Sequence, residues 1–182
     1  MKKYLDRIAE APILSPKASV KAPVIIAGHG PGLQKISAEK ADGLFLFLQT
    51  TETVKQARSI IGPRKLLPVA VRCVLDPNPE SARALARRAC AFYISRPPYH
   101  KVWASVGFNE SDWKDGGSDR LIDAICAWGD AETIKKKLQI YVDAGATQIV
   151  VYPCNEEEDY DPENAMSLIW NWDLYEALAP NG

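Results

Sequence analysis

Short apolar runs alternate with segments of helical periodicity along most of the chain. Four runs contain almost no polar residues, and they lie at residues 24–27 (VIIA), 44–48 (LFLFL), 69–75 (VAVRCVL) and 148–152 (QIVVY). Continuous runs of this length are typical of parallel strands that are buried on both faces. The third run contains Arg72, which predicts that one face of that strand is polar.

Helical patterns lie between these runs. The clearest begins at Asn78, which is placed to cap a helix, with Pro79 in the first turn. Apolar residues then recur along one face of this helix, at Ala82, Leu85, Ala86, Ala89 and Tyr93. Three arginines on the remaining surface, Arg83, Arg87 and Arg88, are expected to form a solvated helix face rather than a phosphate-binding patch.

Residues 96–117 interrupt this order and are predicted to form an insertion that contains one short helix. A further helix is expected from about Asp119, and Gly129 and Asp130 separate it from a helix at residues 131–143. After the last apolar run, an acidic loop at residues 156–161 is predicted to lead to a final helix. That helix is capped by Asp161, has Pro162 in its first turn, and buries Leu168, Ile169, Trp172 and Tyr175.

The order of strands and helices predicts an α/β fold with a parallel sheet and right-handed crossovers. The residues alone are compatible with two architectures. One is a small, open, doubly wound sheet, and the other is half of a (β/α)8 barrel, whose full form needs about 250 residues. The length of 182 residues fits a single domain in either case.

Composition and charge exclude several classes of protein. The formal net charge of -1 argues against a nucleic-acid-binding surface, which would be basic. No apolar run approaches the roughly 18 residues of a membrane span, and the N-terminus lacks the apolar centre of a secretory signal. The cysteines form no CxxC pair, so we expect buried, reduced thiols in a cytoplasmic protein and no metal site. They are Cys73, Cys90, Cys126 and Cys154.

The segment GHGPG at residues 28–32 directly follows the first apolar run. In parallel α/β proteins ligands bind at the carboxyl ends of the strands, and glycines permit positive φ and close approach to the backbone. Pro31 suits the start of a helix, whose first N–H groups, those of Gly30, Gly32 and Leu33, favour an anion. A tight strand-to-helix turn without a ligand explains the same pattern equally well. The segment is neither a Walker loop nor a GxGxxG fingerprint.

Several stretches together resemble one family. Residues 115–153, which begin DGGSDRLIDAICAWGD, are similar to the C-terminal part of luciferase-like flavin and deazaflavin oxidoreductases. The resemblance is closest to the branch that uses coenzyme F420, an 8-hydroxy-5-deazaflavin. Residues 30–50 (GPGLQKISAEKADGLFLFLQT), 77–108 and 172–180 agree with the same branch, so that the resemblance covers nearly all of the chain from about Ala22 onward.

The resemblance implies a (β/α)8-type barrel whose Gly-Pro loop holds the phosphate end of a cofactor, F420 or alternatively FMN. The cofactor-binding residues would be Gly28, His29, Gly30, Pro31, Gly32 and Leu33. It also implies that the insertion borders the substrate pocket, which makes Tyr99 and His100 candidate substrate-binding residues. Arg120, just after the insertion, is a third candidate, as an anion contact. Their alternatives are ordinary packing for Tyr99, surface exposure for His100 and an ion pair or cap for Arg120. His29 is equally compatible with a solvent-facing turn.

The expected activity is hydride transfer between F420 and an unknown organic small molecule, and no catalytic residue is predicted. The alternatives are an FMN-dependent monooxygenase, or a non-catalytic half-barrel that binds a phosphate-bearing ligand or a partner subunit. The resemblance covers only the C-terminal half of such an enzyme. Since four strands cannot close an eight-stranded barrel, we expect this single partial domain to pair with a second copy or with a complementary N-terminal half-barrel.

Overall fold

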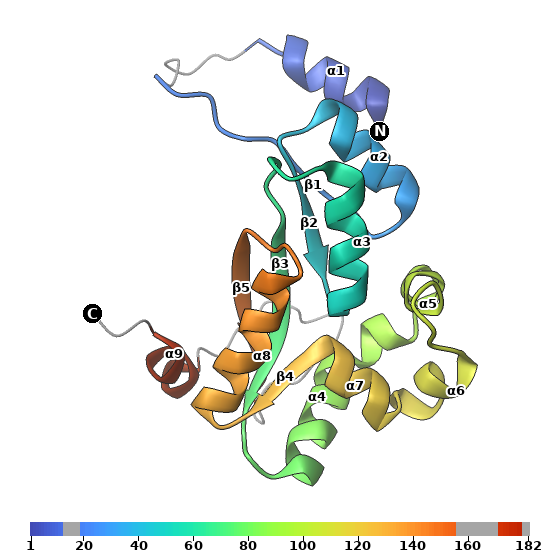
Figure 1. Ribbon diagram of the computed structural model, residues 1–182. Helices are drawn as coiled ribbons and strands as arrows, with labels where there is room; N and C mark the ends of the chain where they lie inside the picture. Colours follow the sequence, from blue (N-terminus) through green and yellow to red (C-terminus); the bar gives the residue numbers. More distant parts are fainter. Residues whose placement is uncertain (13–18, 156–170, 180–182) are drawn as a thin grey trace.

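The computed structural model describes residues 1–12, 19–155 and 171–179, and its centre is a parallel β-sheet (Figure 1). The strands are β1 (Ile25–Ala27), β2 (Gly43–Phe47), β3 (Pro68–Leu75), β4 (Cys126–Gly129) and β5 (Gln148–Pro153). Each of the four predicted runs forms a strand. The short strand β4 was not predicted, because its four residues (CAWG) are too few to show a periodicity.

Strand β3 lies at the middle of the sheet and pairs along both of its edges. On one edge, β5 follows it from Pro68↔Gln148 to Cys73↔Pro153. On the other edge, β2 pairs with the start of β3, and β4 pairs with its end from Arg72 to Leu75. In the described part of the chain, β1 pairs only with β2 and β5 only with β3, so the sheet is open. An open, parallel α/β sheet is the arrangement that the residues predict.

The helices connect the strands in the predicted order. They are α1 (Lys2–Glu10), α2 (Pro31–Lys40), α3 (Thr51–Ile61), α4 (Pro79–Ile94), α5 (Pro97–Ala104), α6 (Glu110–Trp113), α7 (Asp119–Ile125), α8 (Ala131–Asp143) and α9 (Trp172–Leu178), with a 3-10 turn at Lys114–Gly116. The Asn78 side chain accepts hydrogen bonds from the N–H groups of Glu80 and Ser81, which confirms the predicted cap of α4. The predicted loop at residues 156–161, and Asp161, Pro162, Leu168 and Ile169, lie outside the described residues.

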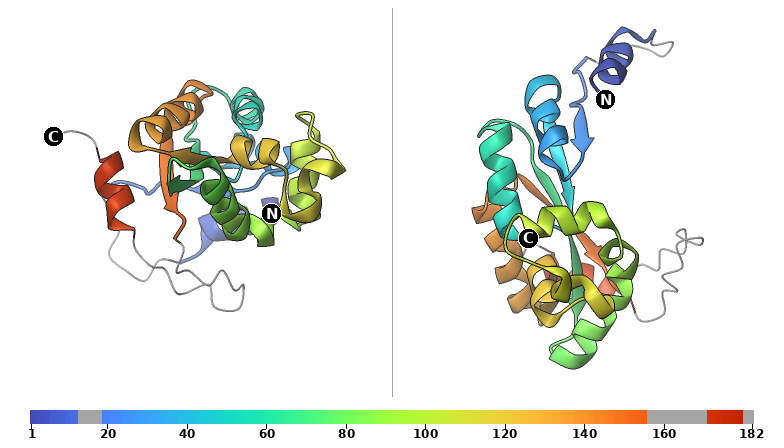
Figure 2. Two further views of the ribbon diagram at one scale, coloured as in Figure 1. Left: turned by 90° about the horizontal axis from the view of Figure 1, so that it is seen from below. Right: turned by 90° about the vertical axis from the view of Figure 1, so that its right-hand side faces the viewer.

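Each face of the sheet has its own hydrophobic cluster. Helices α3, α8 and α9 cover one face, where Leu46, Val71 and Tyr141 are fully or almost fully buried. Helices α4, α5 and α7 pack against the opposite face near the ends of β3 and β4, around the buried Trp103 and Val74. Figure 2 shows α3 and α8 on one side of the sheet and α4 on the other.

The second face is only partly covered. Ile149 and Val151 point toward α8, so Val150 and Tyr152 point to the opposite face, where they are 40% and 36% exposed. Ile25 of β1 lies on the same face and is 37% exposed. The surface that the described helices leave open lies on the strands themselves. Its exposed residues are Ile25, Val150 and Tyr152, and the buried Arg72 lies beside them with its guanidinium 4.8 Å from the Tyr152 ring centroid.

Three further sequence predictions meet different outcomes. All four cysteines are buried thiols outside any disulfide, as expected, and the Sγ atoms of Cys90 and Cys126 lie 3.6 Å apart. Trp172 is 66% exposed, so its predicted burial is wrong, and Leu174 fills that role instead. Within the described ranges, no helix is long and apolar enough to cross a membrane, and no group of three metal-ligating side chains lies together.

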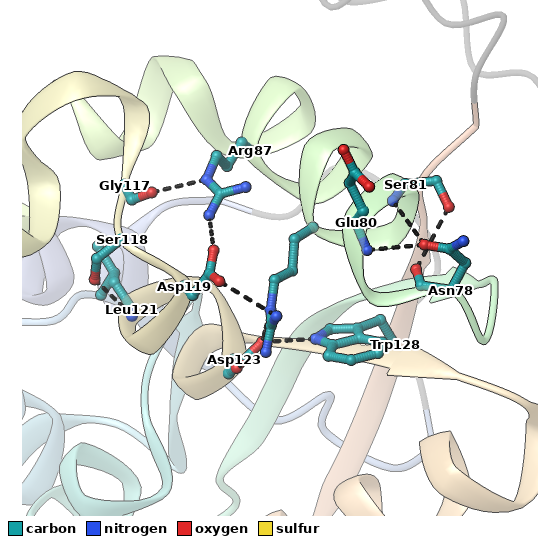
Figure 3. A network of polar contacts seen from close by, with 11 residues as sticks. Asn78, Glu80, Ser81, Arg87, Gly117, Ser118, Asp119, Leu121, Asp123 and Trp128 are labelled. Carbon is teal, nitrogen blue, oxygen red and sulfur yellow. Dashed lines mark hydrogen bonds and ion pairs between the residues drawn. The ribbon is translucent and has the colours of Figure 1, made fainter.

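Arg83 and Arg87 of α4 are bonded to α7 and to Gly117 just before it, which corrects the prediction that they form a solvated face. Figure 3 shows Arg87 with Gly117 and Asp119. The Arg83 guanidinium donates two hydrogen bonds to Asp123, at 2.9 and 2.6 Å. Arg87 donates to the Gly117 carbonyl at 2.8 Å and pairs with Asp119. The Trp128 indole N–H also donates to Asp123, at 2.8 Å. These bonds join the end of the insertion to α4, and they join α7 to α4 and to β4.

We expect Asp123→Asn to lower the free energy of unfolding by about 1–2 kcal/mol at pH 7. Burial would raise the pKa of the Asp123 carboxyl, but the hydrogen bonds from Arg83 and Trp128 outweigh it and hold the pKa below its usual value. The wild-type advantage is therefore present above the unfolded pKa of about 3.9, and it is lost as the pH falls through the lower folded pKa.

Urea unfolding at a series of pH values measures this difference. The exposed Asp173→Asn serves as a control and should leave the profile unchanged. An Asp123→Asn chain as stable as the wild type at pH 7 would contradict the assigned role.

Candidate functional site: a cavity beside the Gly-Pro loop

The Gly-Pro loop, residues 28–32, joins the carboxyl end of β1 to α2. The Gly28 N–H donates to the Phe45 carbonyl at 3.3 Å, which extends the pairing of β1 with β2 by one residue. Gly30 is the extended residue before α2, and Pro31 is the first helical residue, as predicted. The Gln34 side chain is buried and donates to the His29 carbonyl at 2.7 Å. The loop is therefore held by the strand pairing at Gly28, by the Gln34 side chain at His29, and by the start of α2 at Pro31.

The three glycines of the loop matter because they have no side chain, and none of them has a positive φ. The prediction that they supply positive φ is wrong. A Cβ on Gly28 would lie 2.5 Å from Cδ1 of Leu33, so Gly28 allows α2 to approach the strand closely. A Cβ on Gly30 or Gly32 would have no described heavy atom within 4 Å beyond its chain neighbours. These two glycines leave open space beside the backbone.

The first turn of α2 leaves two N–H groups for a ligand. The N–H groups of Leu33 and Gln34 donate to the Gly30 carbonyl, at 3.1 and 3.2 Å, so the Leu33 amide is used inside the helix rather than left open. Among the described residues, no acceptor is bonded to the N–H of Gly30 or Gly32. Both groups lie at the helix end where the macrodipole favours negative charge.

A cavity of about 850 Å³ lies between the Gly-Pro loop, α3 and α5. The residues that line it are Ala27, Gly28, His29, Gly30, Pro31, Leu33, Gln34, Thr53, Gln56, Ile60, Pro98, Lys101, Val102 and Ser105. The lining residues of α3 and of α5 each recur at helical spacing, so one face of each helix forms a wall. Of these described lining residues, Lys101 alone carries a full charge.

His29, which lines the cavity, contacts Tyr99 from a distant part of the sequence, although Tyr99 is not itself among the lining residues. Their ring centroids are 4.8 Å apart, and Tyr99 also contacts Tyr93 and Trp103 at 5.7 and 5.5 Å. Burial lowers the pKa of His29, so its ring is neutral at pH 7. Its Nδ1 atom is buried without a hydrogen-bond partner in the described part of the chain. The insertion thus touches the loop through an aromatic contact.

Helix α5 is fixed to the sheet by Trp103. The buried Trp103 indole N–H donates to the Leu48 carbonyl at 3.1 Å, directly after β2. Leu48 has a φ of 51°, a left-handed conformation that is uncommon for a residue other than glycine. His100 lies 2.5 Å from the Ile94 carbonyl through Nε2 and stacks on Trp113, and it is not among the lining residues. His100 therefore stabilises the insertion through contacts with the Ile94 carbonyl and the Trp113 ring.

Arg120 lies away from the cavity and binds the insertion to α7. Its guanidinium donates to the buried Asp112 carboxylate at 2.8 Å and to the Gly107 carbonyl at 3.0 Å. It also covers the Phe108 ring at 4.2 Å. Of the three candidate substrate residues, the structure brings only Tyr99 to the loop.

Three further residues that line the cavity, Lys101, Thr53 and Gln56, were not predicted from the sequence. The signal in the insertion was the recurrence of Pro98, Lys101 or Val102, and Ser105 at helical spacing. It became meaningful only once the position of α5 beside the loop was known.

The open parallel sheet, its surrounding helices and the cavity at a strand end define half of a (β/α)8-type barrel. A family model described as luciferase-like monooxygenase matches residues 3–148. The chain therefore belongs to the luciferase-like monooxygenase family. No match was found among curated protein sequences.

Three solved structures share this fold. The chain is 18% identical to the coenzyme F420 dependent tetrahydromethanopterin reductase from Methanopyrus kandleri, with a TM-score of 0.53 over 72% of this chain and 44% of that one. An F420-dependent secondary alcohol dehydrogenase, in complex with an F420-acetone adduct, gives 16% identity and a TM-score of 0.55 over 78% and 46%. The structure of apo-MsnO8 gives 18% identity and a TM-score of 0.50 over 98% and 58%. The chain spans about half the length of these structures.

We expect Gly28→Ala to lower the free energy of unfolding by about 1–3 kcal/mol, since the added methyl group overlaps the Leu33 side chain. Gly32→Ala is the matched control. It adds the same group to open space inside a helix, where alanine is preferred over glycine, and should be neutral or slightly stabilising. Chemical denaturation of both variants measures the difference, and equal stabilities would contradict the close approach of α2 to β1.

Proposed function

We propose that this chain is part of an F420-dependent oxidoreductase and that the Gly-Pro loop binds the phosphate end of the cofactor. The observation that carries the proposal is the N–H group of Gly30, which has no acceptor among the described residues and lies at a helix N-terminus beside the cavity. The Gly32 N–H in the same turn is also open among the described residues, although Gly32 itself does not line the cavity. Membership of the luciferase-like family supports an oxidoreductase. The names of two structures that share the fold support F420 as the cofactor.

The residues of the loop have separate roles in this proposal. The N–H groups of Gly30 and Gly32 donate to the anion, and their missing side chains give it access. Pro31 begins the helix without leaving a further donor open, and Gly28 holds α2 against the strand. His29 and Leu33 form the wall of the cavity beside the anion. A volume of about 850 Å³ suits a ligand much larger than a phosphate ion.

The chemistry that F420 supplies when bound is hydride transfer at its C5 carbon to or from an organic substrate. This chain's own contribution is to bind and orient the tail of the cofactor. Tyr99, which contacts His29, is the insertion residue that we propose to border the substrate. His100 and Arg120 would act indirectly, by holding the insertion in place.

Two alternatives keep the same anion site. The family model is described as monooxygenase, which favours FMN as the second candidate cofactor, since FMN also ends in a phosphate. The uncovered sheet face favours the third candidate, a half-barrel that binds a phosphate-bearing ligand without catalysis. Binding of F420 and FMN to the purified chain separates these possibilities.

We expect Gly30→Asp to weaken binding of F420 by about tenfold or more, because it places a carboxylate beside the ligand's anion. The fold should tolerate the change, since the position is open and aspartate is a favourable N-cap residue. Gly30→Asn, of the same size and without the charge, is the control and should bind more tightly than Gly30→Asp. Fluorescence titration with F420 and with FMN measures all three chains, and unchanged affinity in Gly30→Asp would exclude an anion at this position.

We also propose that another half-barrel covers the open sheet face, either a second copy of this chain or a complementary half. The free edges of β1 and β5 and the exposed Ile25, Val150 and Tyr152 support this proposal. Apolar strand surfaces with unpaired edges favour association.

We expect the isolated chain to behave as a dimer or larger species in size-exclusion chromatography with light scattering. Val150→Lys should shift it toward monomer, because it places a charge on the open face. Val142→Lys is the control, since Val142 is similarly exposed but lies on α8. A stable, monodisperse wild-type monomer would count against association through this face.

A further inference from the structure

We propose that the free edge of β5 pairs with β5 of a second copy of this chain, antiparallel and about a two-fold axis at Val150. This inference rests on the association proposed above and is independent of the cofactor. It adds the identity of the partner, the segment that meets it and the alignment of the two strands.

Strand β5 is the longest strand with a free edge in the described part of the sheet (Figure 1). It spans six residues and pairs there only with β3, whereas β1 and β4, which also have one neighbour each, span three and four. Edge strands are usually kept from pairing by charged side chains, by internal prolines or by bulges. The β5 sequence QIVVYP contains no charge, its register with β3 is continuous, and its proline is the last residue.

The backbone of β5 directs alternate residues to its two edges. The Cys154 N–H donates to the Cys73 carbonyl at 2.9 Å, which places the even-numbered residues of β5 on the side of β3. Ile149 and Val151 therefore direct their N–H and C=O groups to the free edge. Outside the strand ladders, the described residues provide no hydrogen-bond partner for these groups. The edge thus presents a donor and an acceptor at each of two alternate residues.

These groups are symmetric about Val150, so a second copy of the same strand is the matching partner. In an antiparallel pair, Ile149 of one copy lies opposite Val151 of the other, and each residue donates and accepts one hydrogen bond. Val150 then lies opposite its own counterpart on the two-fold axis, and Gln148 lies opposite Tyr152. Closed two-fold dimers are the commonest assemblies of identical chains, and no charged residue of β5 opposes this one.

Side chains of the open sheet face also meet in this arrangement. Val150 and Tyr152 are 40% and 36% exposed, and they lie on the face opposite α8 together with the exposed Gln148. Directly opposed β-branched side chains stabilise a strand pair, so the two Val150 residues contribute to the dimer. The two-fold axis is perpendicular to the sheet, so the open faces of both copies lie on the same side. They remain available to a complementary half-barrel.

Disulfide trapping with introduced cysteines tests this alignment. Opposed residues of a non-hydrogen-bonded antiparallel pair have Cα atoms about 4.5 Å apart, a separation that a disulfide can span. The four native cysteines are at most 2% exposed, so the introduced thiol is the accessible one. Oxidised glutathione accepts the two electrons and two protons that are released when two thiols join. Val142→Cys on α8 is the matched control, because Val142 is 42% exposed.

We expect Val150→Cys to form a disulfide-linked dimer about tenfold or more faster than Val142→Cys, because pairing raises the local concentration of the thiol. A mixture of Gln148→Cys and Tyr152→Cys should cross-link faster than either variant alone, since these two residues are opposed. Non-reducing gel electrophoresis measures the rates. Light scattering of the wild type gives its oligomeric state, and urea unfolding under reducing conditions checks the fold of each variant.

The possible failures of the two proposals differ. A monomeric wild type, together with equal cross-linking of Val150→Cys and Val142→Cys, overturns both the edge pairing and the association proposed above. A dimeric wild type with the same equal rates overturns the edge pairing and leaves association through another surface standing. Fast cross-linking of Val150→Cys without a faster mixed pair overturns the antiparallel alignment, and with it this inference. None of these results affects the titrations with F420 and FMN.

Discussion

Strand β3 is hydrogen-bonded to other strands along both of its edges, and this pairing sets the positions of β2, β4 and β5. Its residues from Val69 to Val74 are buried on both faces, and their backbone groups are bonded to β5 on one edge and to β2 and β4 on the other. Unpaired backbone groups at such depth would cost free energy comparable to a lost hydrogen bond each. The end of β2, to which Trp103 and α5 attach, is therefore set by the centre of the sheet.

The insertion is held by polar bonds as much as by apolar contacts. Arg83, Arg87 and Arg120 all bind carboxylates or carbonyls within or next to it. These three arginines are committed to the fold and cannot serve a ligand without breaking those bonds. Lys101, on the side of α5 that faces the cavity, has no such engagement among the described residues.

The strands and most helices could be predicted, because burial on both faces and helical spacing leave periodic signals in the sequence. Strand β4 could not be predicted, because four residues are too few to show a periodicity. Its formation depends on pairing with the last residues of β3, from Arg72 to Leu75. The loop was predicted to be an anion site, and the positive φ expected of its glycines is absent from the structure. Gly28 allows the Leu33 side chain to approach the backbone closely, whereas Gly30 and Gly32 leave open space beside it. Both effects depend on neighbouring residues that the local sequence does not specify.

The sequence by itself determined the α/β class, the order of the elements and the position of the Gly-Pro loop at the end of a strand. These features depend on local spacing, caps and turn residues. Only the tertiary structure decided that Tyr99 meets His29, that Arg120 serves the fold, and that Lys101 lines the cavity. The reason is that α5 is about seventy residues from the loop, and its orientation depends on one buried indole bonded to the end of β2.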